Sequence, residues 1–316
     1  MNKIIKSFCI YCDNGNLNQI KKMIKKGIDV HTCDDYAFRK ACECGYLDIA
    51  KYLYENGANI FSKNNQALYK ACKYDNFEIV KFLIEKEYNI ITCGDKAFSI
   101  ACEYGNLDIA KLIYTYNVDI NHKKNNAIKK AYANGHLHII KYLITIGMDI
   151  HIEKDICFNL ACENGHEDII KYFIKEDYDY ENDKYNPVES ATKHNQPNII
   201  KILLENDYDS PNAIYIALNE NNKHTIDFLI KNSIQTKLNI NTIMKNLVKI
   251  DQIEYFEYLY LKYDIYDENK IFKFCCKFYN NTPESSILDI IKKKNILIDE
   301  IKKETIQYYN LQNYFL

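Results

Sequence analysis

The stretch "ACECGYLDIAKYLYENGANI", residues 41–60, decides the fold, because the chain repeats it almost unchanged at residues 101–120, "ACEYGNLDIAKLIYTYNVDI". The underlying interval is half that distance. Aligned on the first alanine, the pattern recurs every 30 residues, at Tyr11, Ala41, Ala71, Ala101, Ala131, Ala161 and Ala191. A period of this length is typical of a solenoid, in which each unit packs mainly on its two neighbours.

Each unit is predicted to contain two short helices, one over residues 37–44 and one over residues 47–56 in the quoted stretch. Both carry apolar residues on one face. Neither helix is long enough to be stable alone in water, so each pair must stack on the next. The apolar residues are Phe38, Ala41, Cys42, Ile49, Ala50 and Leu53.

Two turn positions recur in every unit, and both favour residues that tolerate a left-handed backbone. The position between the helices holds only glycine, asparagine or aspartate: Gly15, Gly45, Asp75, Gly105, Gly135, Gly165, Asn195, Asn221 and Asp251. The position after the second helix holds Gly27, Gly57, Glu87, Asn117, Gly147, Asp177 and Asp207. A loop of about seven residues, such as 60–66, is expected to lead to the next unit.

A charge pattern also recurs, with an acid and a lysine three residues apart on the second helix. Such pairs contribute about 0.2–0.5 kcal/mol each and indicate a solvated outer face. The pairs are Asp48–Lys51, Glu78–Lys81, Asp108–Lys111 and Asp168–Lys171.

These features together resemble ankyrin repeats. The clearest matches are "GYLDIAKYLYENGANI" (45–60), "GNLDIAKLIYTYNVDI" (105–120) and "GHEDIIKYFIKEDYDY" (165–180), and the resemblance covers residues 5–232 well and 240–296 weakly. It implies an all-α protein, an ankyrin-type α-solenoid of stacked helix-turn-helix repeats. The usual repeat has about 33 residues. The three missing residues fall in the loop, where the usual Thr-Pro is absent except for Pro187. The β-hairpin loops are therefore expected to be short or irregular.

The resemblance gives an expected organisation. Residues 1–36 form an N-terminal capping repeat, with Lys6, Tyr11 and Cys12 where inner units are more apolar. Residues 233–296 form degenerate C-terminal repeats, in which Leu247 takes the alanine position, and 297–316 a final helix or cap. The repeats between are 37–66, 67–96, 97–126, 127–156, 157–186, 187–210 and 211–232.

Composition restricts the classes of function. The 316 residues carry a net charge of -2 and a single arginine, Arg39, which disfavours nucleic-acid binding. No long apolar run predicts a membrane span, and no export signal is evident at the N-terminus. We expect an intracellular, cytoplasmic protein. The short repeats and the abundance of residues with A/T-rich codons are similar to those of giant DNA viruses (mimivirus-like), which places it in the host cytoplasm or the virion; an A/T-rich protist is the alternative origin.

No pattern predicts chemistry. The cysteines at one helix position, Cys42, Cys72, Cys102 and Cys162, suit a small buried apolar site. Cys9 and Cys12 lack a second pair at zinc-site spacing. His136 and His138, two residues apart, are expected to point in different directions. The chain contains no phosphate-binding or nucleophile motif. We therefore expect no enzyme, no metal and no cofactor.

What remains is the surface. An ankyrin-like stack presents a concave face made of its loops and the exposed side of its first helices. The varying residues expected there are the candidate partner-binding set: Tyr36, Glu43, Lys73, Tyr74, Glu103, Tyr104, Asn134 and Glu163, with Gln66, Lys96 and Asn126 in the loops. Tyrosine with mixed charge is a composition that interfaces favour, and Tyr36, Tyr74 and Tyr104 are expected to form a stripe.

The resulting hypothesis is a monomeric, non-enzymatic scaffold that binds a protein partner along the concave groove. Two alternatives stay open. One is an adaptor whose segment 240–316 recruits ubiquitin-ligase machinery, by analogy with virus ankyrin proteins that carry an F-box-like segment. The other is a structural component of the virion.

Overall fold

The computed structural model describes residues 3–86, 90–118, 126–148, 154–176, 186–208, 210, 212–220 and 222–233, together with Ile243, Leu247, Tyr255 and Phe256. Within this described part of the chain all regular structure is helical, sixteen α-helices and no strand. The chain divides into two compact units, Met1–Asn182 and Asp183–Leu316. The fold is an all-α solenoid of paired helices.

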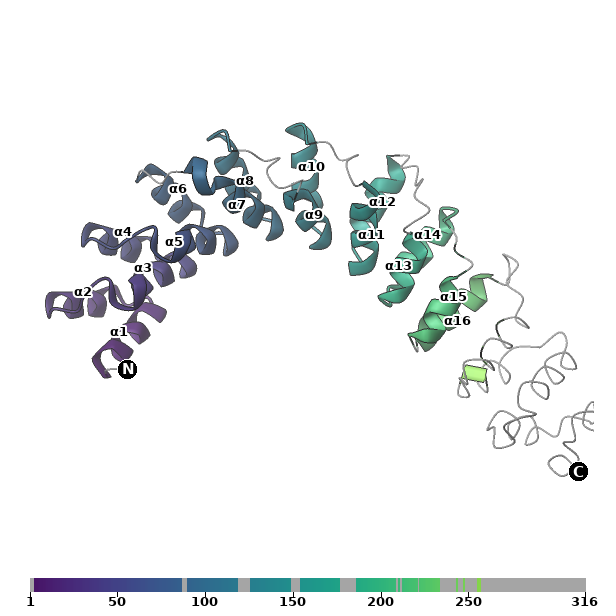
Figure 1. Ribbon diagram of the computed structural model, residues 1–316, viewed down its shortest axis with the longest axis horizontal. Coiled ribbons are helices and arrows are strands. Elements are labelled where there is room, and N and C mark those ends of the chain that lie inside the picture. The colour runs from purple at the N-terminus through teal and green to yellow at the C-terminus, as the bar shows by residue number, and fades with distance from the viewer. Residues whose placement is uncertain are drawn as a thin grey trace, which may run out of the picture. The chain divides into compact units, whose positions relative to one another are not determined.

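The first unit consists of six helix pairs in which first helices pack on first helices (Figure 1). The first helices are α1 (Lys3–Asp13), α3 (Thr32–Cys44), α5 (Ser62–Lys73), α7 (Ile90–Glu103), α9 (Asn126–Ala133) and α11 (Lys154–Asn164). The second helices are α2 (Leu17–Lys25), α4 (Leu47–Glu55), α6 (Phe77–Glu85), α8 (Leu107–Tyr114), α10 (Leu137–Thr145) and α12 (Glu167–Lys175).

The second unit begins with two further pairs, α13 (Pro187–Lys193) with α14 (Pro197–Glu205) and α15 (Ala213–Asn219) with α16 (Lys223–Ser233). Four later residues are helical and buried, among them Leu247, the residue expected at the alanine position. The other predictions for residues 234–316, including the final helix or cap and a partner-recruiting tail, lie outside the described residues. The repeat boundaries stay a prediction.

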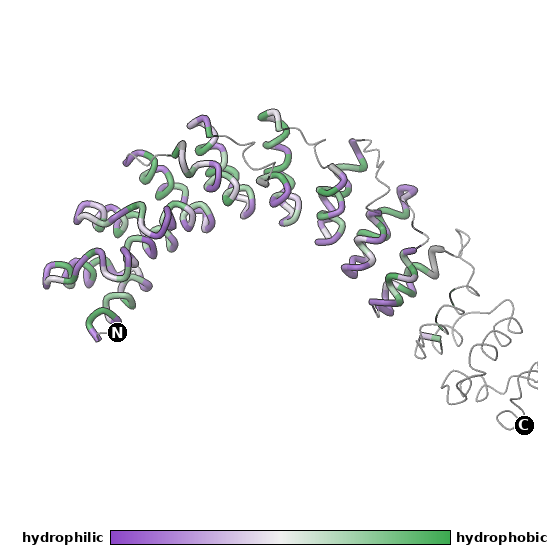
Figure 2. The backbone as a smooth tube through the Cα atoms, in the orientation of Figure 1, coloured by the Kyte–Doolittle hydropathy of each residue, from purple (hydrophilic) through white to green (hydrophobic). Residues whose placement is uncertain are grey.

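The core is built from the recurring apolar positions. The alanine position is fully closed, with Ala41, Ala71, Ala101, Ala131 and Ala161 at most 1% exposed. The cysteines that follow four of these alanines are all 0% exposed, as predicted for a small apolar site. Figure 2 shows hydrophobic residues recurring within both helices of each pair. Because helices of 7–14 residues are unstable alone, this packing between pairs is what stabilises them.

The two predicted turn positions are confirmed wherever the structure describes them. Between the helices, φ is positive at Gly15, Gly45, Asp75, Gly105, Gly135, Gly165 and Asn195. After the second helix, φ is positive at Gly27, Gly57, Asn117, Gly147 and Asp207. Glycine, asparagine and aspartate are the residues that adopt this conformation at least cost.

The loops between units differ from a β-hairpin. In the two described at greatest length, three consecutive residues take left-handed dihedrals, Cys33–Asp35 and Lys63–Asn65, before the right-handed helix starts. The predicted loop 60–66 therefore contains a short left-handed turn, and its last five residues fall within α5. Four of the six residues are aspartate or asparagine, which accept this backbone.

Neighbouring loops are tied to each other by hydrogen bonds. The buried Asp35 carboxylate accepts from the Asn59 backbone N–H at 2.8 Å, and the Ser62 hydroxyl donates to the Asp34 carbonyl at 2.7 Å. The connections that hairpins make in longer repeats are made here by single side chains.

A second set of bonds joins the units at the turn between the helices. The residue after each turn reaches back to the last carbonyl groups of the preceding first helix. Asn76 Nδ2 donates to the carbonyls of Cys42 (2.9 Å) and Glu43 (2.8 Å). The equivalent donors are Tyr46, Asn106, His136 and His166, which bond Asp13, Cys72 and Lys73, Glu103, and Ala133 respectively. Each of these five units thus satisfies carbonyl groups at the C-terminus of the first helix in the unit before it.

Two smaller expectations were wrong. His138 Nε2 donates to the Gly105 carbonyl at 2.8 Å, so His136 and His138 both reach the preceding unit, with ring centroids 5.9 Å apart. Lys171 forms an ion pair with Glu167 at 3.1 Å, four residues away, in place of the expected Asp168. An i, i+4 pair spans one helical turn as closely as an i, i+3 pair, so spacing alone does not choose between them.

Candidate functional site

The predicted partner-binding residues all lie on or at the ends of first helices. We call the exposed side of α3, α5, α7, α9 and α11, with the residues that follow each helix, the first-helix face. It carries Tyr36 and Glu43 on α3, Lys73 and Tyr74 at the end of α5, Glu103 and Tyr104 at the end of α7, Asn134 after α9, and Glu163 on α11.

Lys73 joins two of the predicted tyrosines. Its ammonium group lies 5.4 Å from the ring centroid of Tyr74 and 4.8 Å from that of Tyr104. The two tyrosines are 50% and 40% exposed, among the most exposed large hydrophobic side chains of the described residues. A hydrogen bond with the Tyr104 hydroxyl and the charge of nearby groups raise the pKa of Lys73, so it is protonated at neutral pH. The group forms a cationic, aromatic patch across two units.

Glu43 forms ion pairs with two lysines of the same chain, Lys40 and Lys70. Its carboxylate accepts from Lys40 Nζ at 3.2 Å and also pairs with Lys70 of the next unit. Partial burial would raise the pKa of Glu43, but the hydrogen bonds with Lys70 and Lys40 outweigh it and the pKa is lowered. Glu43 therefore links two units and is less available to a partner than the sequence suggested.

Glu103 and Asn134 are engaged in the same way. Glu103 pairs with Lys130, one unit further along, and Asn134 Nδ2 donates to the Lys130 carbonyl at 2.8 Å. Glu163 lies half-buried near the end of α11, where its charge contributes to the raised pKa of Cys162 after the larger effect of burial.

Tyr36 lies apart from the other two tyrosines of the expected stripe. Its hydroxyl donates to Asp13 Oδ1 at 2.5 Å, and the Arg39 guanidinium lies 6.0 Å from its ring centroid. Arg39 in turn donates to Gln66 and to the backbone of Cys33 and Asp34. The structure thus brings Tyr74 and Tyr104 together through Lys73, and places Tyr36 in a different contact group.

A hollow of about 430 Å³ lies in the first-helix face between α5 and α7. It includes three residues of the predicted set, Lys73, Glu103 and Tyr104, and the expected loop residues Gln66 and Lys96, the latter on α7. Sequence reasoning missed the remainder: Lys63, Asn64, Tyr69, Lys70 and Ile100. Helical spacing could have predicted part of this lining, because Gln66, Tyr69 and Lys73 lie on one face of α5.

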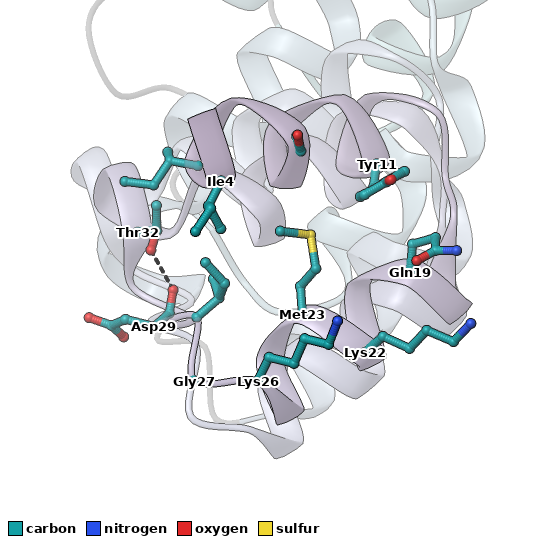
Figure 3. Close-up of a pocket in the computed structure, with 12 residues that line it drawn as sticks. Ile4, Tyr11, Gln19, Lys22, Met23, Lys26, Gly27, Asp29 and Thr32 are labelled. Carbon is teal, nitrogen blue, oxygen red and sulfur yellow. Dashed lines mark hydrogen bonds between the residues drawn. The ribbon is translucent and has the colours of Figure 1, made fainter. Parts of the chain in front are cut away.

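A second, larger cleft of about 770 Å³ lies in the N-terminal unit (Figure 3). Ile4 and Tyr11 border it from α1, Met23 points into it from α2, and Lys22 and Lys26 lie along α2 at its edge. In inner units the equivalent surface is buried, as at Ala41 (1% exposed), where this unit has Tyr11.

The N-terminal cleft lies on α1 and α2, the first described helix pair, and extends to Thr32. Its lining includes the polar side chains of Ser7, Tyr11 and Gln19 where the next unit has Ala37, Ala41 and Ile49. The capping role of this unit stays a prediction. Lys6 is exposed, whereas Cys12 is 1% exposed and is buried like the cysteines of inner units.

Potential metal ligands and thiols are spread over several helices of the described residues. Among them, no three His, Cys, Asp or Glu side chains converge as metal ligands. Burial raises the pKa of Cys12 and Cys102 to about 12 and that of Cys42 higher, so these thiols stay protonated. The search of the described part of the chain finds no helix both long and apolar enough to cross a membrane.

Comparison with solved structures supports the fold. No curated protein matches the sequence. The human ASB11 ankyrin repeat domain, one of 186 matching solved chains, superposes with a TM-score of 0.50 at 16% identity, covering 62% of this chain and 96% of that one. A likeness at this identity shows the fold alone.

The family comparison is direct. The model for ankyrin repeats (3 copies) matches residues 8–93, 87–154 and 129–213. Ankyrin repeats are a non-enzymatic module that generally mediates protein–protein interaction. Because these matches together span residues 8–213 of the 316, more than half of the sequence, the chain belongs to the ankyrin-repeat family.

Proposed function

We propose that this protein is a non-enzymatic scaffold that binds a protein partner along the groove of its ankyrin stack, on the first-helix face. The observation that carries the proposal is the hollow between α5 and α7, where the exposed Tyr104 ring and the half-buried Tyr69 ring lie beside lysines from two consecutive repeats. Aromatic side chains give large contact area at low cost in conformational entropy. The hollow is also continuous with the exposed Tyr74 through Lys73.

The proposal includes a setting for this activity. We infer a monomeric protein of the cytoplasm, encoded by a giant DNA virus and acting in the host cell. Two features support that origin: the short repeat period of 30 residues, and the 28 tyrosines, a residue with A/T-rich codons. Size-exclusion chromatography with light scattering would test the oligomeric state, and a mass well above 37.3 kDa would overturn it.

Proximity labelling with the full chain in the native cell tests the binding function. The variant is Tyr74→Ala/Tyr104→Ala, which removes exposed rings from the first-helix face. The matched control is Tyr116→Ala, since Tyr116 is exposed to a similar degree (41%) but follows a second helix. We expect proteins enriched by the wild type and by the control to be lost in the double variant. Equal enrichment by all three proteins would refute binding at this face.

A further inference from the structure

The hollow between α5 and α7 has an unbalanced charge. Its lining contains four lysines, Lys63, Lys70, Lys73 and Lys96, and one carboxylate, Glu103. The whole protein carries a net charge of -2, so this excess of positive charge is local. Local excess charge attracts ligands of the opposite sign.

Ion pairs within the protein account for part of the excess. Lys70 pairs with Glu43, and Lys63 Nζ lies 2.8 Å from Asp34 Oδ2. Glu103, the carboxylate of the lining, forms an ion pair with Lys130, which is not part of the lining. Lys73 and Lys96 are the lining lysines for which the described residues show no ion pair.

These two lysines are held by aromatic rings. Lys96 Nζ lies 4.5 Å from the ring centroid of Tyr69, and Lys73 Nζ lies 4.8 Å from that of Tyr104. A cation–π contact fixes the position of an ammonium group without neutralising its charge. Both cations are therefore positioned within the hollow and keep their capacity to bind an anion.

We propose that the hollow receives an acidic segment of the protein partner, with Lys73 and Lys96 binding its aspartate or glutamate carboxylates. This inference rests on the proposed scaffold function and names the chemistry of its partner. Tyr69 and Tyr104 position the two lysines, and Ile100 supplies an apolar contact for the segment between the charges. Lys63 and Lys70 add positive potential while remaining paired.

The same geometry disfavours a nucleic acid in this hollow. Single-stranded nucleic acids bind by stacking bases on open aromatic faces beside a cationic groove. Here a lysine already covers one face of Tyr69 and of Tyr104. The single arginine, Arg39, is occupied by Gln66 and the backbone of its own loop.

The test uses the full chain and a fluorescein-labelled octapeptide of glutamate, with an octapeptide of glutamine as the uncharged reference. Fluorescence anisotropy measures the affinity at 50 and 200 mM salt. The variant is Lys73→Gln/Lys96→Gln. The matched control, Lys51→Gln/Lys81→Gln, removes the same charge from exposed positions on α4 and α6.

We expect the glutamate peptide to bind more tightly than the glutamine peptide, and less tightly at the higher salt. The double variant should lower the affinity by about tenfold, since two surface contacts with charged groups are lost. The control should change it less than twofold. Circular dichroism of both variants shows whether the helical content is retained.

Three results would overturn the assignment. These are equal binding of the two peptides, an equal loss in the variant and the control, or tighter binding of a single-stranded oligonucleotide than of the glutamate peptide. The proximity-labelling experiment separates this inference from the scaffold function. If Tyr74→Ala/Tyr104→Ala loses the partner but Lys73→Gln/Lys96→Gln retains it, the scaffold stands and the acidic segment is refuted.

Discussion

Gly45 offers a direct test of how neighbouring units are joined. It adopts φ +80°, and a Cβ built on it would lie 2.6 Å from Asn76 Oδ1 of the next unit. Gly57, the turn after the second helix, adopts φ +93° but has no atom within 4 Å of such a Cβ. Gly45→Ala and Gly57→Ala therefore impose the same backbone strain, and only the first disturbs a contact between units.

The two costs follow from these distances. A non-glycine residue with left-handed dihedrals costs about 1–2 kcal/mol, and this is the whole expected effect of Gly57→Ala. At Gly45 the added methyl group also displaces the Asn76 amide from its bonds to the Cys42 and Glu43 carbonyls, 2.9 and 2.8 Å long. Each bond contributes about 0.5–1.5 kcal/mol. Gly45→Ala should therefore destabilise the protein by about 2–5 kcal/mol.

Urea denaturation of the full chain, followed by far-ultraviolet circular dichroism, measures both free energies of unfolding. The Asn76→Ala variant completes a double-mutant cycle with Gly45→Ala. Because the methyl group already breaks the Asn76 bonds, Asn76→Ala should cost almost nothing in the Gly45→Ala background. The reasoning is refuted if Gly45→Ala and Gly57→Ala cost the same, or if the two changes in the cycle are additive.

Three further predictions concern protonation, thiol access and the core. Burial lowers the pKa of His136 below its ordinary 6.5, so the stability contributed by the neutral ring is complete above about pH 6.5 and is lost as the pH falls below it. His136→Asn, which introduces the residue found at the equivalent positions Asn76 and Asn106, should lose less stability between pH 7.5 and 5.5 in urea titrations; an equal loss would contradict this. Iodoacetamide should modify the exposed Cys33 in the native protein but the buried Cys42 only after unfolding, as followed by mass spectrometry; early labelling of Cys42 would show that the packing is wrong. Phe98→Ala, at a site 1% exposed, should cost about 3–5 kcal/mol in the same urea assay, and a loss below 1 kcal/mol would argue against burial.

The repeat itself made the fold predictable from the sequence. A period of 30 residues and restricted turn positions specify where helices end, and a buried alanine specifies which face packs, as at Ala41. The loops were harder to predict. No pattern in "SKNNQ" distinguishes a shortened hairpin from the left-handed turn at Lys63–Asn65, because the same residue types favour both.

The sequence predicts where the candidate residues lie on the helices, but it does not predict which of them are paired. Exposure follows from helical phase, so the sequence correctly assigned Lys73, Tyr74 and Tyr104 to the ends of first helices. Which exposed charges are already paired depends on side chains one unit away. Glu43 with Lys70 and Glu103 with Lys130 are 27 residues apart, a spacing that no single helix reveals.

The bonds that cross each turn bear on how such a chain can change over generations. In the units of Tyr46, Asn76, Asn106, His136 and His166, the residue after the turn donates to the end of the preceding first helix, and four of these units also accept such a bond from the unit that follows. A duplicated segment therefore brings both its donor side chain and its acceptor carbonyl groups, and a deleted segment removes both. The segments that become neighbours can then form the same hydrogen bond without further substitutions. The donor itself has drifted among tyrosine, asparagine and histidine at Tyr46, Asn76 and His136. The stack can therefore gain or lose whole repeats, while its exposed residues change and bind new partners.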